Sequence, residues 1–411
     1  MDSSPVGRFR EFLRIPSISS QGPIDGSYAA AVKLLSSWMN EIGLSDIRTI
    51  DYTERKPVLI GTLLGTNPSL PSILLNGHYD VVPVSDPSAW SVDDPFGAAK
   101  RADGRIIARG SQDMKCVVVQ YLECLRKLRG DPNWRPERTV HVSFLPDEEA
   151  GGLDGAAKFV QSPEFRELNV GMALDEGLAN PENKFHLFYG ERASNWVIIR
   201  TTGPTGHGSR FIKDTAIEKM TRILARIYQH RSEIEPKCHH TALGDLLSMN
   251  VTAMKAGVPS SAFRGGFAIN VIPSEAEIAI DIRVPLTITD VESIIRNDWV
   301  KDEKDVEIDF VDRNEHPDPS ILQSPVADDR WVRAVTKGIK RALSDVDVSL
   351  DVFPAGTDGR YIRRMGIPCI GFSPIRNTPV LLHDNDEFVT EDGFVEGIDV
   401  YVEILRELTH S

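Results

Sequence analysis

Cysteine is scarce in this chain of 411 residues, which has only four cysteines and no Cys-x-x-Cys spacing. Such low usage argues against a disulfide framework and is typical of a protein kept in a reducing compartment. No apolar run approaches the length of a membrane span. The first residues, Met1–Pro5, also lack the basic region and apolar run of a signal peptide. We therefore expect a cytoplasmic protein that does not associate with a membrane.

Positive charge is also in deficit, since 46 lysines and arginines face 60 aspartates and glutamates, giving a net charge of −14. This balance argues against a nucleic-acid or anionic-membrane partner. It does not exclude a small anionic substrate, because local basic groups and metal ions set the field inside a site. With 41% hydrophobic residues over 411 positions, the chain is long enough to form two domains with large cores.

Strand and helix patterns alternate along the first part of the chain. Apolar runs predict strands over residues 58–64, 72–75, 139–145 and 170–174, and helical spacing predicts a helix over residues 114–128. This alternation indicates the α/β class, with a mostly parallel central sheet and helices on its faces.

Residues 191–311 follow a different order, β-α-β-β-α-β, which predicts a split βαβ, ferredoxin-like α+β module with an antiparallel sheet. We expect it to be inserted into the first domain. The predicted division is therefore 1–190 for the first part of the catalytic domain, 191–312 for the inserted domain, and 313–411 for the second part of the catalytic domain.

Acidic and imidazole side chains recur where the predicted strands end. His78 and Asp80 follow one strand, Glu148 and Glu149 follow another, and the Asp175-Glu176 pair follows a third. Asp113 lies in a strand-to-helix loop, and His383 lies in a late acidic stretch. Taken singly, these acidic side chains are more often solvated loop acids, helix caps or turns than metal ligands. Ligands of α/β sheets gather beyond the carboxyl ends of strands, so together they predict one site.

The donor set of this predicted site comprises two histidines and at least three carboxylates. That is too many ligands for one tetrahedral zinc ion. It fits two metal ions about 3.5–4 Å apart that share a bridging carboxylate. Oxygen ligands with one imidazole for each metal suit Zn²⁺, with Co²⁺ or Mn²⁺ as possible substitutes. Glu148, next to the candidate ligand Glu149, is then placed to take a proton from water as general base.

Six short motifs carry a resemblance to a known family. They are Ser72–Asn76 with His78, Asp80–Val84, Ala108–Gly110 with Gln112–Cys116, Pro146–Glu149, Ala173–Gly177 and Thr378–Asp384. They resemble the co-catalytic zinc metallopeptidase and deacylase superfamily that includes acetylornithine deacetylase and succinyl-diaminopimelate desuccinylase. Within it, the chain is most similar to the aminoacylase-1 family of N-acyl-L-amino-acid amidohydrolases. The similarity covers nearly the whole chain, and the last motif is specific to aminoacylases.

The resemblance implies a role for each ligand. His78, Asp113 and Glu176 would hold one zinc ion, and Asp113, Glu149 and His383 the other, so Asp113 would bridge them. Asp80 would orient His78, and Glu148 would be the general base. The acid of the Asp175-Glu176 pair that binds metal is implied to be Glu176, with Asp175 as the alternative.

The resemblance also implies that the inserted domain is a lid and dimerisation domain. His207 would reach the partner subunit's site in trans and stabilise the oxyanion, so the active form would be a homodimer. Asn270 and Arg283 would contact the substrate, with the Arg283 guanidinium gripping its carboxylate. Arg283 could instead be a salt-bridge partner within a strand, and His207 a loop histidine. Thr357 and Arg360 lie in a second stretch that resembles a substrate-facing loop.

The predicted activity is zinc-dependent hydrolysis of N-acyl-L-amino acids to a carboxylate and a free L-amino acid, by attack of a metal-bound water with Glu148 as general base. A dipeptidase of the same two-zinc superfamily is the alternative, because both activities use the same metal centre. A metal-dependent scaffold without catalysis is a third hypothesis. The complete set of ligand and base positions argues against that one.

Overall fold

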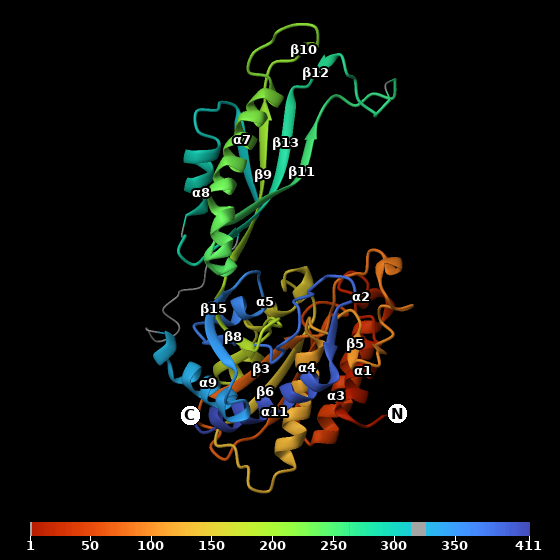
Figure 1. Cartoon of the computed structure of the whole chain (residues 1–411), viewed down its shortest axis with the longest axis vertical. Helices are drawn as coiled ribbons and strands as arrows, with labels where there is room; N and C mark the ends of the chain where they lie inside the picture. Colours follow the sequence, from red (N-terminus) through yellow and green to blue (C-terminus); the bar gives the residue numbers. More distant parts are fainter. Residues whose placement is uncertain (1, 263, 289, 314–325) are drawn as a thin grey trace. The chain divides into compact units, whose positions relative to one another are not determined.

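The computed structural model describes residues 2–262, 264–288, 290–313 and 326–411 (Figure 1). Its contacts divide the chain into two compact units. The described parts of residues 1–190, 317–351 and 357–411 form the first unit, and those of residues 191–316 and 352–356 form the second. The short stretch 352–356 thus belongs to the second unit, whereas the boundary predicted at residue 313 assigns it to the catalytic domain.

The first unit is built on an eight-stranded sheet with the strand order β1-β2-β6-β3-β7-β16-β8-β15. The four adjacent strands β6, β3, β7 and β16 are parallel, whereas β1, β2 and β8 pair antiparallel to their neighbours. The predicted α/β class with parallel central strands is therefore confirmed. The strands are β1 Ser45–Asp51, β2 Pro57–Leu63, β3 Ser72–His78, β6 Val140–Leu145, β7 Val170–Asp175, β8 Lys184–Glu191, β15 Asp347–Phe353 and β16 Cys369–Gly371.

A separate core lies on each face of this sheet, because successive side chains of a strand point to opposite faces. Leu75 and Leu174 pack into the larger core, and their neighbours Leu74 and Ala173 pack into the smaller one. The helices of the larger core are α1 Pro5–Leu13, α3 Ser27–Ile42, α4 Lys115–Arg129, α9 Arg330–Ala342 and α11 Glu391–Leu408. Those of the smaller core are α5 Ala156–Phe159, α6 Pro163–Glu167 and α10 Gly359–Arg364.

Short elements complete the first unit. They are α2 Gly22–Asp25, the 3-10 turns at Pro87–Ala89, Glu148–Ala150 and Val326–Asp328, and the small sheet of β4 Ala99–Lys100, β5 Arg105–Ile107 and β17 Phe388–Thr390. In the part of the chain that the structure describes, every helix is too short or too polar to cross a membrane.

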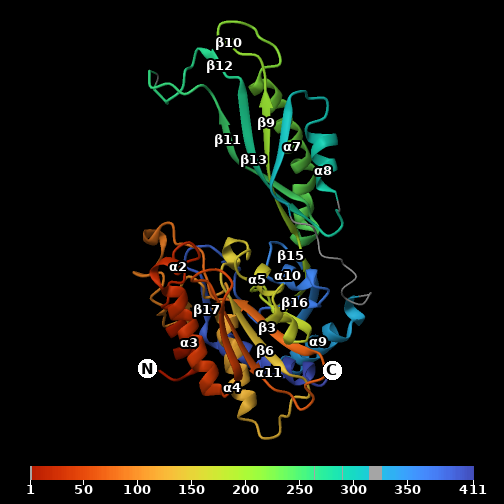
Figure 2. The ribbon, with the colours of Figure 1, turned by 180° about the vertical axis from the view of Figure 1, so that it is seen from behind.

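The second unit is a four-stranded antiparallel sheet with the order β11-β13-β9-β14, and α7 and α8 cover one of its faces (Figures 1 and 2). Ile199 and Ile280 of the sheet pack against Ile223 of α7. The main elements are β9 Ala193–Thr202, α7 Ala216–Ile234, β11 Ser248–Ala256, β13 Glu275–Val284, α8 Val291–Ile294 and β14 Val306–Arg313, which give the order βαββαβ. A π-helical turn at Ile295–Trp299 continues α8, and 3-10 turns follow α7 at Glu235–His239 and Leu243–Asp245. The two-stranded ribbon of β10 Gly206–His207 and β12 Val271–Ile272 adds a further small sheet.

Candidate dinuclear metal site

The candidate ligands of the first unit converge because they follow neighbouring parallel strands. His78 ends β3, Glu148 and Glu149 follow β6, and Glu176 follows β7. Strands β6 and β7 flank β3 on either side and run parallel to it, so their carboxyl ends meet at one edge of the sheet. Asp113 reaches the same edge from the loop before α4, and His383 reaches it from the segment between β16 and β17.

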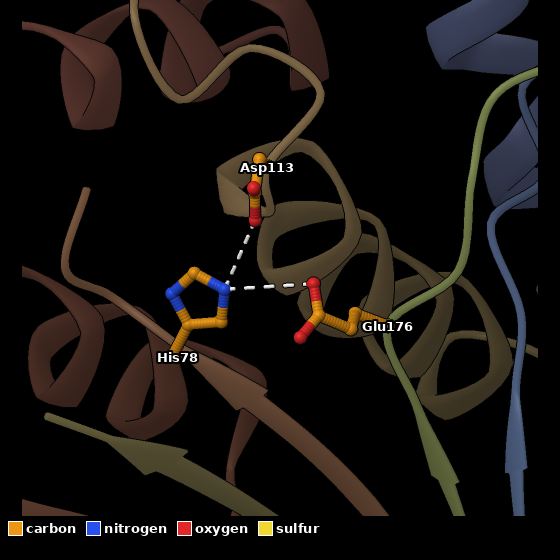
Figure 3. Close-up of side chains that lie close together, drawn as sticks. All are labelled: His78, Asp113 and Glu176. Atoms are coloured by element: carbon orange, nitrogen blue, oxygen red, sulfur yellow. Dashed lines mark hydrogen bonds and ion pairs between the residues drawn. The ribbon is translucent and has the colours of Figure 1, made fainter. Parts of the chain in front are cut away.

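His78, Asp113 and Glu176 form the first group of ligand atoms (Figure 3). His78 Nε2 lies 3.1 Å from Asp113 Oδ1 and 3.7 Å from Glu176 Oε2. All three residues are buried, and the three ligand atoms lie within 4.8 Å of one another. The neighbouring Asp175 is not part of this group, and its Oδ1 accepts a hydrogen bond from Asn76 Nδ2 at 3.1 Å.

Asp113, Glu149 and His383 form the second group. His383 Nε2 lies 3.2 Å from Asp113 Oδ2 and 3.0 Å from Glu149 Oε2. Asp113 therefore presents one carboxylate oxygen to each histidine and is shared by the two groups. The His383 side chain is 55% exposed, whereas that of His78 is 1% exposed, so the second group lies at the open side of the site.

The electrostatics of the cluster show an excess of buried negative charge. Burial and the charge of Glu176 hold the pKa of Glu148 well above its usual range. Burial and the neighbouring Asp113 raise the pKa of Glu149 to about 7. Hydrogen bonds to Asp113 and Glu149 raise the pKa of His383 to about 10. Burial and mutual repulsion both disfavour the charged carboxylates, because few positive charges face them. Divalent cations would supply the missing charge, so the residues present fit a two-metal site.

Asp80 has a wider role than the orientation of His78. His78 Nδ1 lies 3.0 Å from the backbone oxygen of Asp80 and 3.5 Å from its carboxylate Oδ1. The Asp80 carboxylate instead accepts hydrogen bonds from the backbone N–H groups of Glu148 at 3.2 Å and Glu149 at 3.3 Å. The main chain at Asp80 therefore faces His78, and its carboxylate fixes the turn that carries Glu148 and Glu149.

Glu148 is buried at the edge of the first group, with its Oε2 4.0 Å from His78 Nε2. Glu149 faces the second group and accepts a hydrogen bond from the backbone of Val82 at 3.2 Å. The two neighbouring carboxylates thus occupy different positions in the site. Glu148 therefore lies beside the candidate ligands without belonging to either group.

The turn that carries Glu148 begins at a strained residue. Asp147 has a φ of +63°, which non-glycine residues rarely adopt. Its carboxylate accepts a hydrogen bond from Tyr28 Oη at 2.8 Å and forms an ion pair with Lys56. These contacts hold the buried Asp147 in place, and with it the direction in which the chain enters Glu148.

Two further predicted residues, Thr357 and Arg360, lie at the start of α10. Thr357 is 2% exposed, and its Oγ1 accepts a hydrogen bond from the backbone of Gly359 at 3.2 Å. Arg360 Nη2 donates to the backbone oxygen of Gly151 at 2.7 Å, next to the Glu148–Ala150 turn. Asp358 between them is 1% exposed, and neither of its carboxylate oxygens has a hydrogen-bond partner among the described residues. Burial and the charge of Asp175 hold the pKa of Asp358 well above its usual range.

The second unit brings His207 and Asn270 together. The β10–β12 ribbon pairs His207 with Val271, and the backbone N–H of Gly208 donates to the backbone oxygen of Asn270 at 2.8 Å. Both His207 and Asn270 are exposed. Arg283, on β13, forms a bidentate ion pair with Asp281, with Nε 2.8 Å from Oδ1 and Nη2 3.0 Å from Oδ2. This is the strand salt bridge that the sequence left open as the alternative for Arg283.

Sequence reasoning missed three buried residues that hold the site together, namely Arg109, Gln112 and Glu387. The Glu387 carboxylate accepts hydrogen bonds from the backbone N–H groups of Gln112 at 2.6 Å and Asp113 at 3.1 Å. The available signal was position, since Arg109 and Gln112 precede Asp113 closely and Glu387 follows His383 closely.

Comparison with known proteins places this geometry in a family. The model of peptidase family M20/M25/M40 matches residues 74–407. Aminoacylase-1 of Dictyostelium discoideum is 40% identical over 418 aligned positions, covering 100% of this chain and 98% of that protein. The likeness therefore extends over both units rather than over the site alone.

Solved structures with the same fold are more distant in sequence. A metallo-carboxypeptidase of the M20 family from Sulfolobus solfataricus superimposes with a TM-score of 0.73 at 16% identity, with 100% of both chains covered. A Bacillus subtilis protein described as a dinuclear metal-binding peptidase of the M20 family superimposes with a TM-score of 0.64 at 15% identity, covering 99% of this chain and 98% of that one. At this level of identity the likeness establishes the fold alone.

Proposed function

Because this chain belongs to peptidase family M20/M25/M40, and within it to the aminoacylase-1 family, we propose that it hydrolyses N-acyl-L-amino acids to a carboxylate and a free L-amino acid. The observation that carries this proposal is the pair of ligand groups that share Asp113 at the edge of the sheet. Two-metal sites of this kind stabilise both the attacking and the leaving atoms of a hydrolysis.

We propose two Zn²⁺ ions as the resident metals, with Co²⁺ or Mn²⁺ as possible substitutes. His78, Asp113 and Glu176 would hold one ion, and Asp113, Glu149 and His383 would hold the other. When bound, the metals would polarise the substrate carbonyl and lower the pKa of water. Support for this ligand set comes from its excess of buried carboxylate, which the positive charge of the metals would offset.

Glu148 would act as the general base. It would take the proton from the attacking water on a carboxylate oxygen and later deliver that proton to the departing amide nitrogen. The positions of the neighbouring groups support this role. The Asp80 carboxylate accepts a hydrogen bond from the backbone N–H of Glu148, and Glu148 lies beside His78 without belonging to either ligand group. The Asp80 carboxylate would therefore position both the base Glu148 and the neighbouring ligand Glu149.

His207 would stabilise the oxyanion of the tetrahedral intermediate, acting in trans within a homodimer. The hydrogen bonds of its ring support a donor role. The backbone N–H of Ser209 donates to His207 Nδ1 at 3.2 Å, so Nδ1 bears a lone pair and the proton of the neutral ring lies on Nε2. Nε2–H is the group that could donate to an oxyanion.

Asn270, Thr357 and Arg360 would contact the substrate, and Arg283 would bind its carboxylate. The pairing of Arg283 with Asp281 means that a substrate carboxylate would compete with this aspartate for the guanidinium. The hydrogen bond from Arg360 to Gly151 would couple substrate contact at Arg360 to the turn that carries Glu148.

The decisive experiment is hydrolysis of N-acetyl-L-methionine by the purified protein, before and after treatment with a chelator and then with Zn²⁺. We expect activity that the chelator removes and zinc restores. An unblocked dipeptide such as Met-Ala, assayed in parallel, is the comparison for the dipeptidase alternative. Faster turnover of the dipeptide than of the acylated amino acid would contradict the proposal, and so would hydrolysis that persists without metal.

A further inference from the structure

We propose that Arg109, Gln112 and Glu387 form a clamp that positions the Asp113–Glu149–His383 metal site, and that weakening this clamp releases the metal from that site first. This inference rests on the proposed two-metal function. It concerns residues that belong to neither ligand group but hydrogen-bond the loops that carry Asp113 and His383.

The first half of the clamp is the Glu387 carboxylate, which is 0% exposed. Its Oε2 accepts hydrogen bonds from Arg109 Nη1 at 3.0 Å and from the backbone N–H of Gly110 at 2.9 Å. Its Oε1 accepts from the backbone N–H groups of Gln112 at 2.6 Å and Asp113 at 3.1 Å. Hydrogen bonds to an ionised acceptor are among the stronger ones in proteins. One side chain four residues after His383 thus fixes the main chain that carries Asp113.

The second half of the clamp consists of the Arg109 and Gln112 side chains, which bind the main chain around His383. Arg109 donates to the backbone oxygens of His383 at 3.2 Å and Asp384 at 3.0 Å. The Gln112 side chain donates to the backbone oxygens of Pro379 at 3.0 Å and Phe388 at 2.8 Å, and it accepts the N–H of Leu381 at 3.0 Å. Side chains next to Asp113 therefore fix the main chain that carries His383.

The two metal sites depend on this clamp unequally. His78 ends a strand that pairs with neighbours on both sides, and its ring is 1% exposed. His383 lies in a segment without regular secondary structure, has a φ of +65°, and its ring is 55% exposed. A left-handed conformation at a non-glycine residue persists only where its surroundings enforce it. At His383 those surroundings include Arg109, which binds its carbonyl group.

The test is a count of metal ions per chain in the full-length variants Glu387→Gln and Gln112→Ala, equilibrated with zinc at a series of buffered free concentrations. The amide of Glu387→Gln can accept only through its oxygen, so part of the hydrogen-bonding that holds the Asp113 loop is lost. Gln112→Ala removes the three hydrogen bonds to residues 379–388 without changing the charge. We expect both variants to bind the first metal as the unmodified protein does and the second about 10–100-fold more weakly.

Asp384→Asn is the matched control, because it removes a carboxylate from the same segment at an exposed position. We expect it to bind two metals with unchanged affinities. Circular dichroism and thermal melting verify that each variant is folded, and visible absorption of Co²⁺-loaded protein reports which site is filled. Activity of the clamp variants should return when free zinc is raised.

Two results would overturn the clamp. Folded Glu387→Gln and Gln112→Ala proteins that bind both metals with wild-type affinity would show that the clamp does not set metal binding. Loss of both metals in parallel would show that it acts on the whole site. If the unmodified protein itself bound no metal, the two-metal function would fail first and the clamp with it, so the two failures are distinguishable.

Discussion

At the scale of single residues, the site depends on the separation of two neighbouring carboxylates. Glu149 faces His383, while Glu148 lies beside His78 and outside both ligand groups. Burial and the charge of Glu176 favour the protonated form of Glu148. A carboxyl group with a raised pKa can both accept a proton from water and return it to a leaving nitrogen near neutral pH. Metal ions nearby would lower this pKa, because their positive charge favours the carboxylate.

Replacing this base gives the most direct residue-scale prediction. Glu148→Gln keeps the size of the side chain but cannot accept the proton. We expect kcat for N-acetyl-L-methionine to fall by about 10²–10⁴-fold, with two metals still bound per chain. Steady-state kinetics and elemental analysis of the same preparation measure both quantities. Wild-type turnover in this variant would assign the base to another group, and loss of a metal would assign Glu148 to the ligands.

Single residues could be predicted from sequence where one strand end carries the signal. His78, Glu149 and Glu176 each follow a recognisable apolar run, and Asp113 lies before a clear helix. Glu387 had no such signal, because the groups that it binds lie more than 270 positions earlier in the chain. The double role of Asp80 was hidden for the same reason, since its backbone partners at Glu148 and Glu149 come from another strand.

At the scale of elements, strand β6 both supports the site and carries a buried histidine. His141 Nε2 donates to the Leu168 oxygen at 3.1 Å, and its Nδ1 accepts from Thr62 Oγ1 at 2.9 Å. Both ring nitrogens of the neutral form therefore have hydrogen-bond partners, and burial disfavours an additional proton on the ring. Burial lowers the pKa of His141 from 6.5 to about 4. The strand is consequently built around an uncharged imidazole.

This histidine predicts a loss of stability in acid. Between pH 6.5 and pH 4 the unfolded chain binds a proton at His141 that the folded chain does not. The free energy of unfolding therefore keeps its full value above pH 6.5 and decreases as the pH is lowered below it. At pH 5 the loss is about 2 kcal/mol. Urea unfolding of the metal-free protein at pH 7 and pH 5 measures it, and His141→Gln should show a smaller loss. The exposed His239→Gln is the control, and equal acid losses in all three proteins would contradict the assignment.

Long periodic elements could be predicted well, and short or irregular ones could not. The helix predicted over 114–128 is α4, and the strand predicted over 139–145 is β6, each within one residue at either end. Strand β1 was not predicted, because it lies at the sheet edge with little of its length buried and so lacks an apolar run. The second helix of the predicted β-α-β-β-α-β order is a short α-helix, Val291–Ile294, followed by a π-helical turn, Ile295–Trp299, since local spacing does not distinguish the two.

At the scale of the whole molecule, the chain order explains how two units arise from one chain. The first unit is interrupted after residue 190 and resumes within the later part of the chain, so its sheet contains strands from both parts. The change from parallel α/β to βαββαβ order made this insertion predictable from sequence. The stretch 352–356 was not predictable in the same way, because its assignment depends on contacts such as that between Arg192 and Phe353.

A homodimer in which His207 acts in trans makes a prediction that only the assembled molecule can test. Glu148→Gln lacks the base, and His207→Ala lacks the oxyanion donor, so we expect each variant alone to be nearly inactive. Mixed subunits would form heterodimers in which the site with an intact Glu148 receives His207 from its partner. After random reassociation half of the dimers are mixed, and each has one complete site, so about a quarter of wild-type activity should return.

The outcome of this mixing experiment separates three arrangements of the molecule. Two different affinity tags, purified in sequence, isolate the mixed dimers and confirm that subunits have exchanged. If isolated mixed dimers stay inactive, His207 serves the site of its own chain or none. If the protein is monomeric in sedimentation experiments, the proposal that His207 acts in trans is wrong, whatever the activity of the unmodified enzyme. Recovered activity that depends on mixing requires residues of two chains in one site, because neither variant alone contains a complete set.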